Sequence, residues 1–126
     1  MSANLELTPE ERDELARLLG KDTLGALLRG WSQLVTQVER GYDDSVYEYT
    51  NDLSVRKRLD ELTAGAGPGL RAKLDAALAE ADRRFMAATE EAARPLGKSR
   101  WAHRVPRRLV GELAEDLGGL DPPPLR

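Results

Sequence analysis

The stretch YDDSVYEYTNDLSVRKRLDEL, residues 42–62, decides the predicted fold. In a helical conformation it places apolar side chains on one face at steps of four, three and four residues, at Tyr42, Val46, Tyr49 and Leu53. From Val55 onward the apolar positions continue on a shifted face through Leu59 and Leu62. We therefore expect a helix whose two halves are buried against different neighbours.

An acidic ladder runs beside this face, because Asp44, Glu48, Asp52 and Arg56 recur every four residues. Side chains four residues apart are neighbours on a helix surface, so Arg56 is expected to pair back to Asp52. Carboxylates of this kind can hold Mg²⁺. Helical metal sites usually draw ligands from two or more helices and add histidine, whereas this chain has one histidine in total. A metal-dependent enzyme on the ladder is thus the third hypothesis, and a salt-bridged surface without metal or cofactor is preferred.

Two helices are predicted before this stretch. Thr8, Pro9 and Glu11 have the spacing of an N-cap, a first-turn proline and a capping box, and Gly20 ends that helix. Asp22 is the predicted N-cap of the next helix, in which apolar residues follow the helical period without a miss over residues 24–38. This second helix has the clearest apolar face in the chain.

The following segments are separated by strong breakers. Either Asp43 or Ser45 can cap the third helix, which is expected to run to about Thr63, where AGAGPG at 64–69 forces a turn. A long helix with many small residues is predicted from 70 to 94, and Pro95 ends it. No strand is predicted anywhere. Residues 95–106 show no period, and a short last helix is expected from Pro106, carrying Leu109, Val110, Leu113 and Leu117.

The predicted fold class is all-α, with four to five helices packed as a small bundle and an ordered irregular basic loop before a short C-terminal helix. We expect one domain over residues 1–119 and a disordered or extended proline-rich tail at 120–126. Residues 22–63 should form an antiparallel helical hairpin with 70–94 packed across it. The predicted core consists of Trp31, Val35, Val38, Tyr49, Leu53, Leu59, Leu74, Leu78 and Phe85.

Composition excludes several classes of protein. The chain has no cysteine, so disulfides and thiolate metal sites are excluded. No apolar run is long enough to span a bilayer and the first residues are acidic, so we expect a cytoplasmic protein with no membrane partner. Arginine outnumbers lysine by 15 to 4, which favours a bacterial origin. The net charge of −3 is typical neither of a polycation nor of a polyanion.

The charges are nevertheless segregated along the chain. Between Glu39 and Asp52 there are five acids and one arginine, interleaved with tyrosines. An acidic, aromatic helix face of this kind steers association with a basic protein. With no catalytic constellation in view, we expect a non-enzymatic protein-binding domain, such as an inhibitor, immunity protein or regulatory subunit. The predicted partner-binding residues are Glu39, Tyr42, Asp43, Asp44, Glu48, Asn51 and Asp52.

The second patch is basic, with six arginine or lysine residues and no acid in residues 94–108. The main alternative hypothesis is a nucleic-acid-associated protein, in which the cations track phosphates and Trp101 stacks on a base. The segment can also fold back onto the acidic ladder or bind an acidic protein. His103 lacks a nucleophilic partner and is read as structural. The alternative site comprises Arg100, Trp101, His103, Arg104, Arg107 and Arg108, and the oligomeric state is left open.

Overall fold

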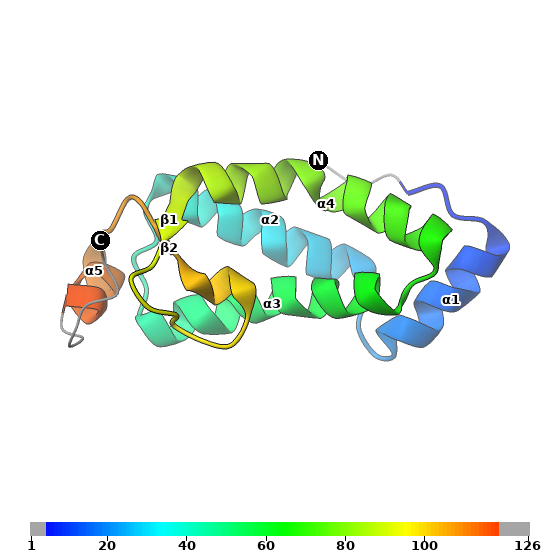
Figure 1. The fold of residues 1–126 in the computed structure, drawn as a ribbon, viewed down its shortest axis with the longest axis horizontal. Helices are drawn as coiled ribbons and strands as arrows, with labels where there is room; N and C mark the ends of the chain where they lie inside the picture. The colour runs from blue at the N-terminus through cyan, green and yellow to red at the C-terminus, as the bar shows by residue number, and fades with distance from the viewer. Residues whose placement is uncertain (1–4, 119–126) are drawn as a thin grey trace.

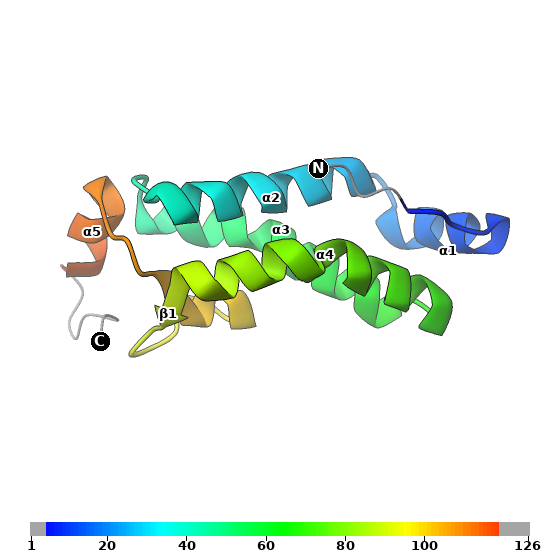
Figure 2. The same cartoon turned by 90° about the horizontal axis from the view of Figure 1, so that it is seen from above.

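The computed structural model describes residues 5–118 and confirms the all-α prediction. Three long helices, α2 (Leu24–Arg40), α3 (Val46–Gly65) and α4 (Pro68–Ala88), run side by side, each antiparallel to the next (Figures 1 and 2). Helix α1 (Pro9–Leu19) and helix α5 (Gly111–Gly118) lie at opposite ends of this elongated bundle. None of the helices in the described part of the chain is long and apolar enough to cross a membrane. The predicted tail at 120–126 lies outside the described residues.

The helix starts resolve the capping predictions. Thr8 caps α1 with a complete capping box, as expected. The cap of α2 is Thr23, whose hydroxyl accepts the Ala26 N–H at 3.3 Å, so the prediction of Asp22 is wrong. Asp22 lies one residue too early and instead accepts a hydrogen bond from Arg58 at 2.7 Å. Of the two candidates for α3, Ser45 is the cap.

The core lies between α2, α3 and α4, and all nine predicted core residues are buried. At its centre three aromatic rings meet. The ring centroid of Trp31 is 5.0 Å from that of Phe85 and 5.3 Å from that of Trp101, with tilted and edge-on geometries that favour aromatic contact. Trp101 therefore joins the core from the loop after α4.

The buried face of α3 differs from the predicted one. It consists of Tyr49, Leu53, Arg56, Leu59 and Leu62, which form one continuous stripe with an arginine at a core position. The predicted pairing of Arg56 with Asp52 is wrong, because the guanidinium points into the bundle. Val55 is half-buried, and a Cβ built at Gly30 of α2 would lie 3.5 Å from it.

The segment after α4 contains a small sheet that the sequence did not predict. Helix α4 ends at Ala88 rather than at 94, and strand β1 (Thr89–Glu91) pairs antiparallel with β2 (Arg104–Pro106), with Glu90 opposite Val105. Between them lies the short 3-10 helix η1 (Arg100–His103). Strands of three residues are too short to show an alternating pattern. We call residues 89–106 the strap.

Helix α5 begins at Gly111 rather than at Pro106, and it packs on the start of α3. The Asp43 carbonyl accepts a hydrogen bond from the Glu112 N–H at 3.0 Å, and the Asp116 carboxylate accepts one from the Val46 N–H at 2.9 Å. Gly111 has φ +56° and approaches Asp43 so closely that a Cβ would lie 2.9 Å from its carbonyl oxygen. Only glycine fits this contact comfortably.

Candidate functional site

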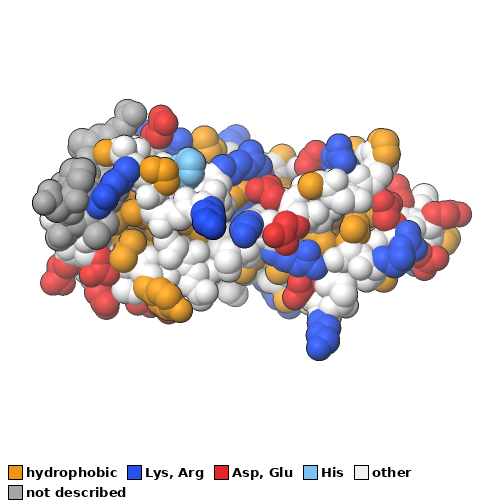
Figure 3. Space-filling model, turned by 60° about the horizontal axis from the view of Figure 1, so that its bottom comes forward, with side chains coloured by type: hydrophobic (Ala, Val, Ile, Leu, Met, Phe, Trp, Pro, Cys, Tyr) orange, Lys and Arg blue, Asp and Glu red, His pale blue; other side chains and the backbone are white. Residues whose placement is uncertain are grey.

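The acidic face lies at the end of the bundle where α3 begins and α5 packs (Figure 3). Its most exposed large apolar side chain is Tyr47, which is 72% exposed. Asp43, Asp44 and Asn51 are exposed around it, and α5 adds further exposed carboxylates. We define the acidic face as Asp43, Asp44, Tyr47, Glu48 and Asn51 of the α3 region together with Glu112 and Glu115 of α5.

A hollow of about 200 Å³ opens beside this face, between the end of α2 and the start of α3. Its charged lining consists of three carboxylates, Asp43, Asp44 and Asp52, and one cation, Arg40. Tyr42 forms part of the wall, and its hydroxyl donates a hydrogen bond to Asp52 at 2.7 Å. Burial, the hydrogen bond to Asp52 and the surrounding negative charge all raise the pKa of Tyr42, so it remains a neutral donor.

The structure brings most of the predicted partner-binding residues together, but three of them already have internal partners. Glu39 lies on α2 and binds Arg84 of α4 through two hydrogen bonds of 2.6 and 2.9 Å. Asp52 accepts the Tyr42 hydroxyl, and Tyr42 itself is buried. Four predicted residues remain at this surface, Asp43, Asp44, Glu48 and Asn51, and of these the Asp44 carboxylate accepts the Ser45 N–H at 2.7 Å.

Sequence reasoning missed the contribution of α5. The acids of this helix are visible in the sequence, but no spacing rule places them on α3, which lies about 70 positions earlier in the chain. The hydrogen bond between Val46 and Asp116 spans that separation. The signal that could have found the contact is Gly111, a glycine just before a short apolar helix, where close approach of two segments is common.

The buried Arg56 is the second unexpected feature. It is 4% exposed and donates two hydrogen bonds to Asp82 of α4, at 2.8 and 2.9 Å, and one to Asp60, at 2.8 Å. Its guanidinium carbon lies 4.4 Å from the ring centroid of Trp101. The indole N–H of Trp31 also donates to Asp82, at 2.9 Å. We call Arg56, Asp60, Asp82, Trp31 and Trp101 the Arg56 cluster.

Asp60 connects the Arg56 cluster to the strap. It accepts the Trp101 indole N–H at 2.8 Å and two hydrogen bonds from Arg100, at 3.1 and 3.3 Å. Burial alone would raise the pKa of Asp60, but the hydrogen bonds from Arg100 and Trp101 and the charge of Arg56 outweigh it, so the pKa is lowered. The guanidinium carbons of Arg56 and Arg100 lie 4.4 and 4.6 Å from the ring centroid of Trp101. The cluster stabilises the strap on the bundle.

The contacts between the strap and the bundle involve residues of the alternative basic site. The strap does fold back onto α3, but through Asp60, so the predicted contact with the acidic ladder is wrong. Trp101 is only 5% exposed, and its ring would have to leave the core to stack on a base. Arg104 donates to the Thr89 hydroxyl at 2.8 Å and to the Thr89 carbonyl at 2.9 Å. These contacts tie two of the predicted nucleic-acid residues to the protein's own backbone and core.

The remaining residues of that site are more exposed. Arg107 donates to the Ala87 carbonyl at 3.2 Å and lies 3.7 Å from Glu90, and Arg108 reaches the Arg40 carbonyl at 3.5 Å. His103 is exposed at the end of η1. Arg107 and Arg108 thus keep exposed guanidinium groups that contact the backbone of α4 and α2.

Metal ligands do not converge on the acidic ladder. Within residues 5–118, no three histidine, cysteine, aspartate or glutamate side chains are placed so that they could hold a metal ion. Comparison of the chain with protein-family models, with curated proteins and with solved structures yields no significant match.

Proposed function

We propose that the chain is a non-enzymatic protein-binding domain of the cytoplasm, an inhibitor, immunity protein or regulatory subunit, whose acidic face engages a basic protein. The observation that carries the proposal is the hollow lined by Asp43, Asp44 and Asp52 at the start of α3, the helix that also exposes the ring of Tyr47. Tyrosine is among the residues enriched at interface hot spots.

The geometry suggests how such a partner is recognised. A lysine or arginine side chain entering the hollow would meet carboxylates from two sides, while Tyr42 holds Asp52 in place from behind. The carboxylates of α5 extend the negative surface outward, which accelerates encounter with a positively charged partner and makes the rate depend on salt. Tyr47 can then bury its ring against an apolar part of that partner.

The test compares the wild type with a neutralised acidic face. The variant Asp43→Asn, Asp44→Asn, Glu48→Gln keeps hydrogen-bond acceptors at each position and removes three charges. The matched control removes three exposed charges away from both the acidic face and the end of α2, with Asp13→Asn, Glu61→Gln and Asp75→Asn. Each immobilised protein is incubated with host extract at low salt and again at physiological salt, and retained proteins are identified by mass spectrometry.

We expect a basic protein that is retained by the wild type and by the control, and that is lost from the neutralised variant and weakened by salt. The purified partner should then bind with an association rate that falls for the neutralised variant only. Retention of no specific protein at low salt, or equal retention by all three proteins, contradicts the proposal.

A further inference from the structure

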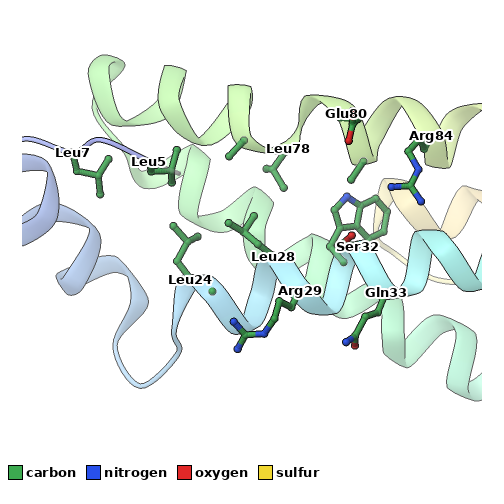
Figure 4. A pocket seen from close by; sticks show the side chains of 14 residues that line it. Leu5, Leu7, Leu24, Leu28, Arg29, Ser32, Gln33, Leu78, Glu80 and Arg84 are labelled. Atoms are coloured by element: carbon green, nitrogen blue, oxygen red, sulfur yellow. The ribbon is translucent and has the colours of Figure 1, made fainter. Parts of the chain in front are cut away.

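A second surface is independent of the acidic face: a groove of about 690 Å³ between α2 and α4. Its floor is apolar and is formed by Leu24, Leu28, Ala77, Leu78 and Ala81, and Trp31 also lines it. Figure 4 shows Leu24, Leu28 and Leu78 among the lining side chains. Leu24, Leu28, Ala77 and Ala81 are only partly buried, so the groove exposes apolar area that the fold leaves uncovered. Grooves of this size and lining are typical binding sites.

The chain itself shows what kind of group the groove accepts. Leu5 and Leu7 precede α1 and line one end of the groove, where both are partly buried (Figure 4). The backbone between them is fixed by Lys73 of α4, whose ammonium donates to the Glu6 carbonyl at 2.8 Å. The groove thus accommodates peptide bearing leucine side chains, whereas its other part, toward Trp31, is open.

Each rim of the open part carries one charged side chain that has no ion-pair partner within residues 5–118, and the two are opposite in sign; Arg84, which is also on the α4 rim, is paired with Glu39. Arg29 lies on the α2 rim and Glu80 on the α4 rim (Figure 4). Within residues 5–118 the side chains of these two residues make no hydrogen bond or ion pair, although the charge of Glu80 reaches Arg84. A lipid carboxylate would be attracted to one rim and repelled by the other. A peptide with an acid on one flank and a base on the other complements both.

We propose that this groove binds an amphipathic helix of a partner protein, with leucine-like residues facing the floor, an acidic flank along Arg29 and a basic flank along Glu80. Such a helix would lie against α2 and α4 on the side that α3 leaves open. Recognition of this kind uses apolar side chains at positions i, i+3, i+4 and i+7.

The probe is a synthetic helical peptide of about 14 residues, with leucines at those positions, glutamates on one flank and lysines on the other. A peptide of the same composition with its leucines scrambled is the control. Binding is followed by amide chemical shifts of the labelled protein. We expect saturable shifts at Gly25, Ser32 and Ala81 with the first peptide and none with the second.

Charge reversal tests the flanks. Arg29→Glu or Glu80→Lys gives both rims the same sign, so each should weaken binding by about two- to fivefold at low salt, the range for an exposed ion pair. The double variant Arg29→Glu/Glu80→Lys should restore affinity, since the peptide can then lie in the opposite direction. Restoration distinguishes charge matching from damage to the fold.

Filling the groove tests its position. Ala77→Trp places an indole on the floor and should abolish binding, whereas Ala79→Trp, on the exposed side of the same helix, should not. Three outcomes overturn the proposal: no shifts with the amphipathic peptide; shifts with dodecanoate but not with peptide, which would indicate an acyl-chain site; or the same shifts on concentrating the protein alone, which would indicate a second copy.

Discussion

Replacing Arg56 with methionine tests the reasoning about the Arg56 cluster most directly. Methionine keeps the packing of the aliphatic stem but removes three hydrogen bonds of 2.8–2.9 Å. Asp60 retains Arg100 and Trp101, whereas Asp82 retains only the indole N–H of Trp31, so most of the cost falls on Asp82.

The expected loss of stability follows from how deeply the Arg56 cluster is buried. Removing one partner of a fully buried ion pair costs roughly 3–5 kcal/mol. The Asp60 and Asp82 side chains are 30% and 25% exposed, so water can solvate them in part and the lower end applies. We expect Arg56→Met to lower the free energy of unfolding by about 3 kcal/mol, or the melting temperature by about 10 °C.

Urea denaturation followed by far-ultraviolet circular dichroism measures this loss. The control is Lys57→Met, since Lys57 is exposed and its side chain makes no hydrogen bond or ion pair within residues 5–118; its effect should stay within about 0.5 kcal/mol. The double variant Arg56→Met/Asp82→Asn keeps an acceptor for Trp31 but removes the unpaired charge, so it should be more stable than Arg56→Met alone by about 1 kcal/mol.

Two results would refute the reasoning. If Arg56→Met lowers the free energy of unfolding by less than about 1 kcal/mol, the guanidinium does not hold the Arg56 cluster together. If the double variant is as unstable as the sum of the two single variants, Arg56 and Asp82 do not act as a pair.

Further predictions concern the stability of the protein at low pH and the effect of replacing two glycines. Because the pKa of Asp60 is lowered in the folded state, its carboxylate contributes to the free energy of unfolding above about pH 4, and this contribution is lost as the pH falls below that value. The difference in stability between the wild type and Asp60→Asn should therefore shrink in acid. Urea titrations from pH 6 to pH 2.5 measure this difference. Gly30→Ala should raise the free energy of unfolding by about 0.5–1 kcal/mol, because its Cβ would lie 3.5 Å from Val55 and fits. Gly111→Ala should lower it by about 2–3 kcal/mol, since its φ is positive and its Cβ would lie 2.9 Å from the Asp43 carbonyl. Thermal melts of both glycine variants check the opposite signs, and equal signs would contradict the contacts described.

The features that could be predicted from the sequence are those that residues close together in the chain determine. The periodic apolar residues of α2 and α4 identified their buried faces, and Ser45 was one of two candidate caps because a cap depends on residues within one turn. The two strands were not predicted because each has only three residues and because their pairing joins segments about 15 positions apart.

Arg56 shows why the candidate site was harder to predict. At its position the apolar stripe of α3 continues, but arginine reads as a surface residue unless its partners are known. Those partners include Asp82, 26 positions away, and the ring of Trp101. The addition of α5 to the acidic face depends on contacts across about 70 positions. Local patterns therefore identified the acids of α3 but not the surface that they share.

The placement of the tryptophans has a consequence for any spectroscopic study of this protein. The chain contains two, and their rings touch each other at the junction of the strap with α2 and α4. Intrinsic fluorescence therefore observes one point of an elongated molecule, and neither α1 nor α5 contributes to it. If the strap opens before the helices melt, the fluorescence transition will precede the loss of ellipticity, and a two-state fit to either signal alone would hide that order.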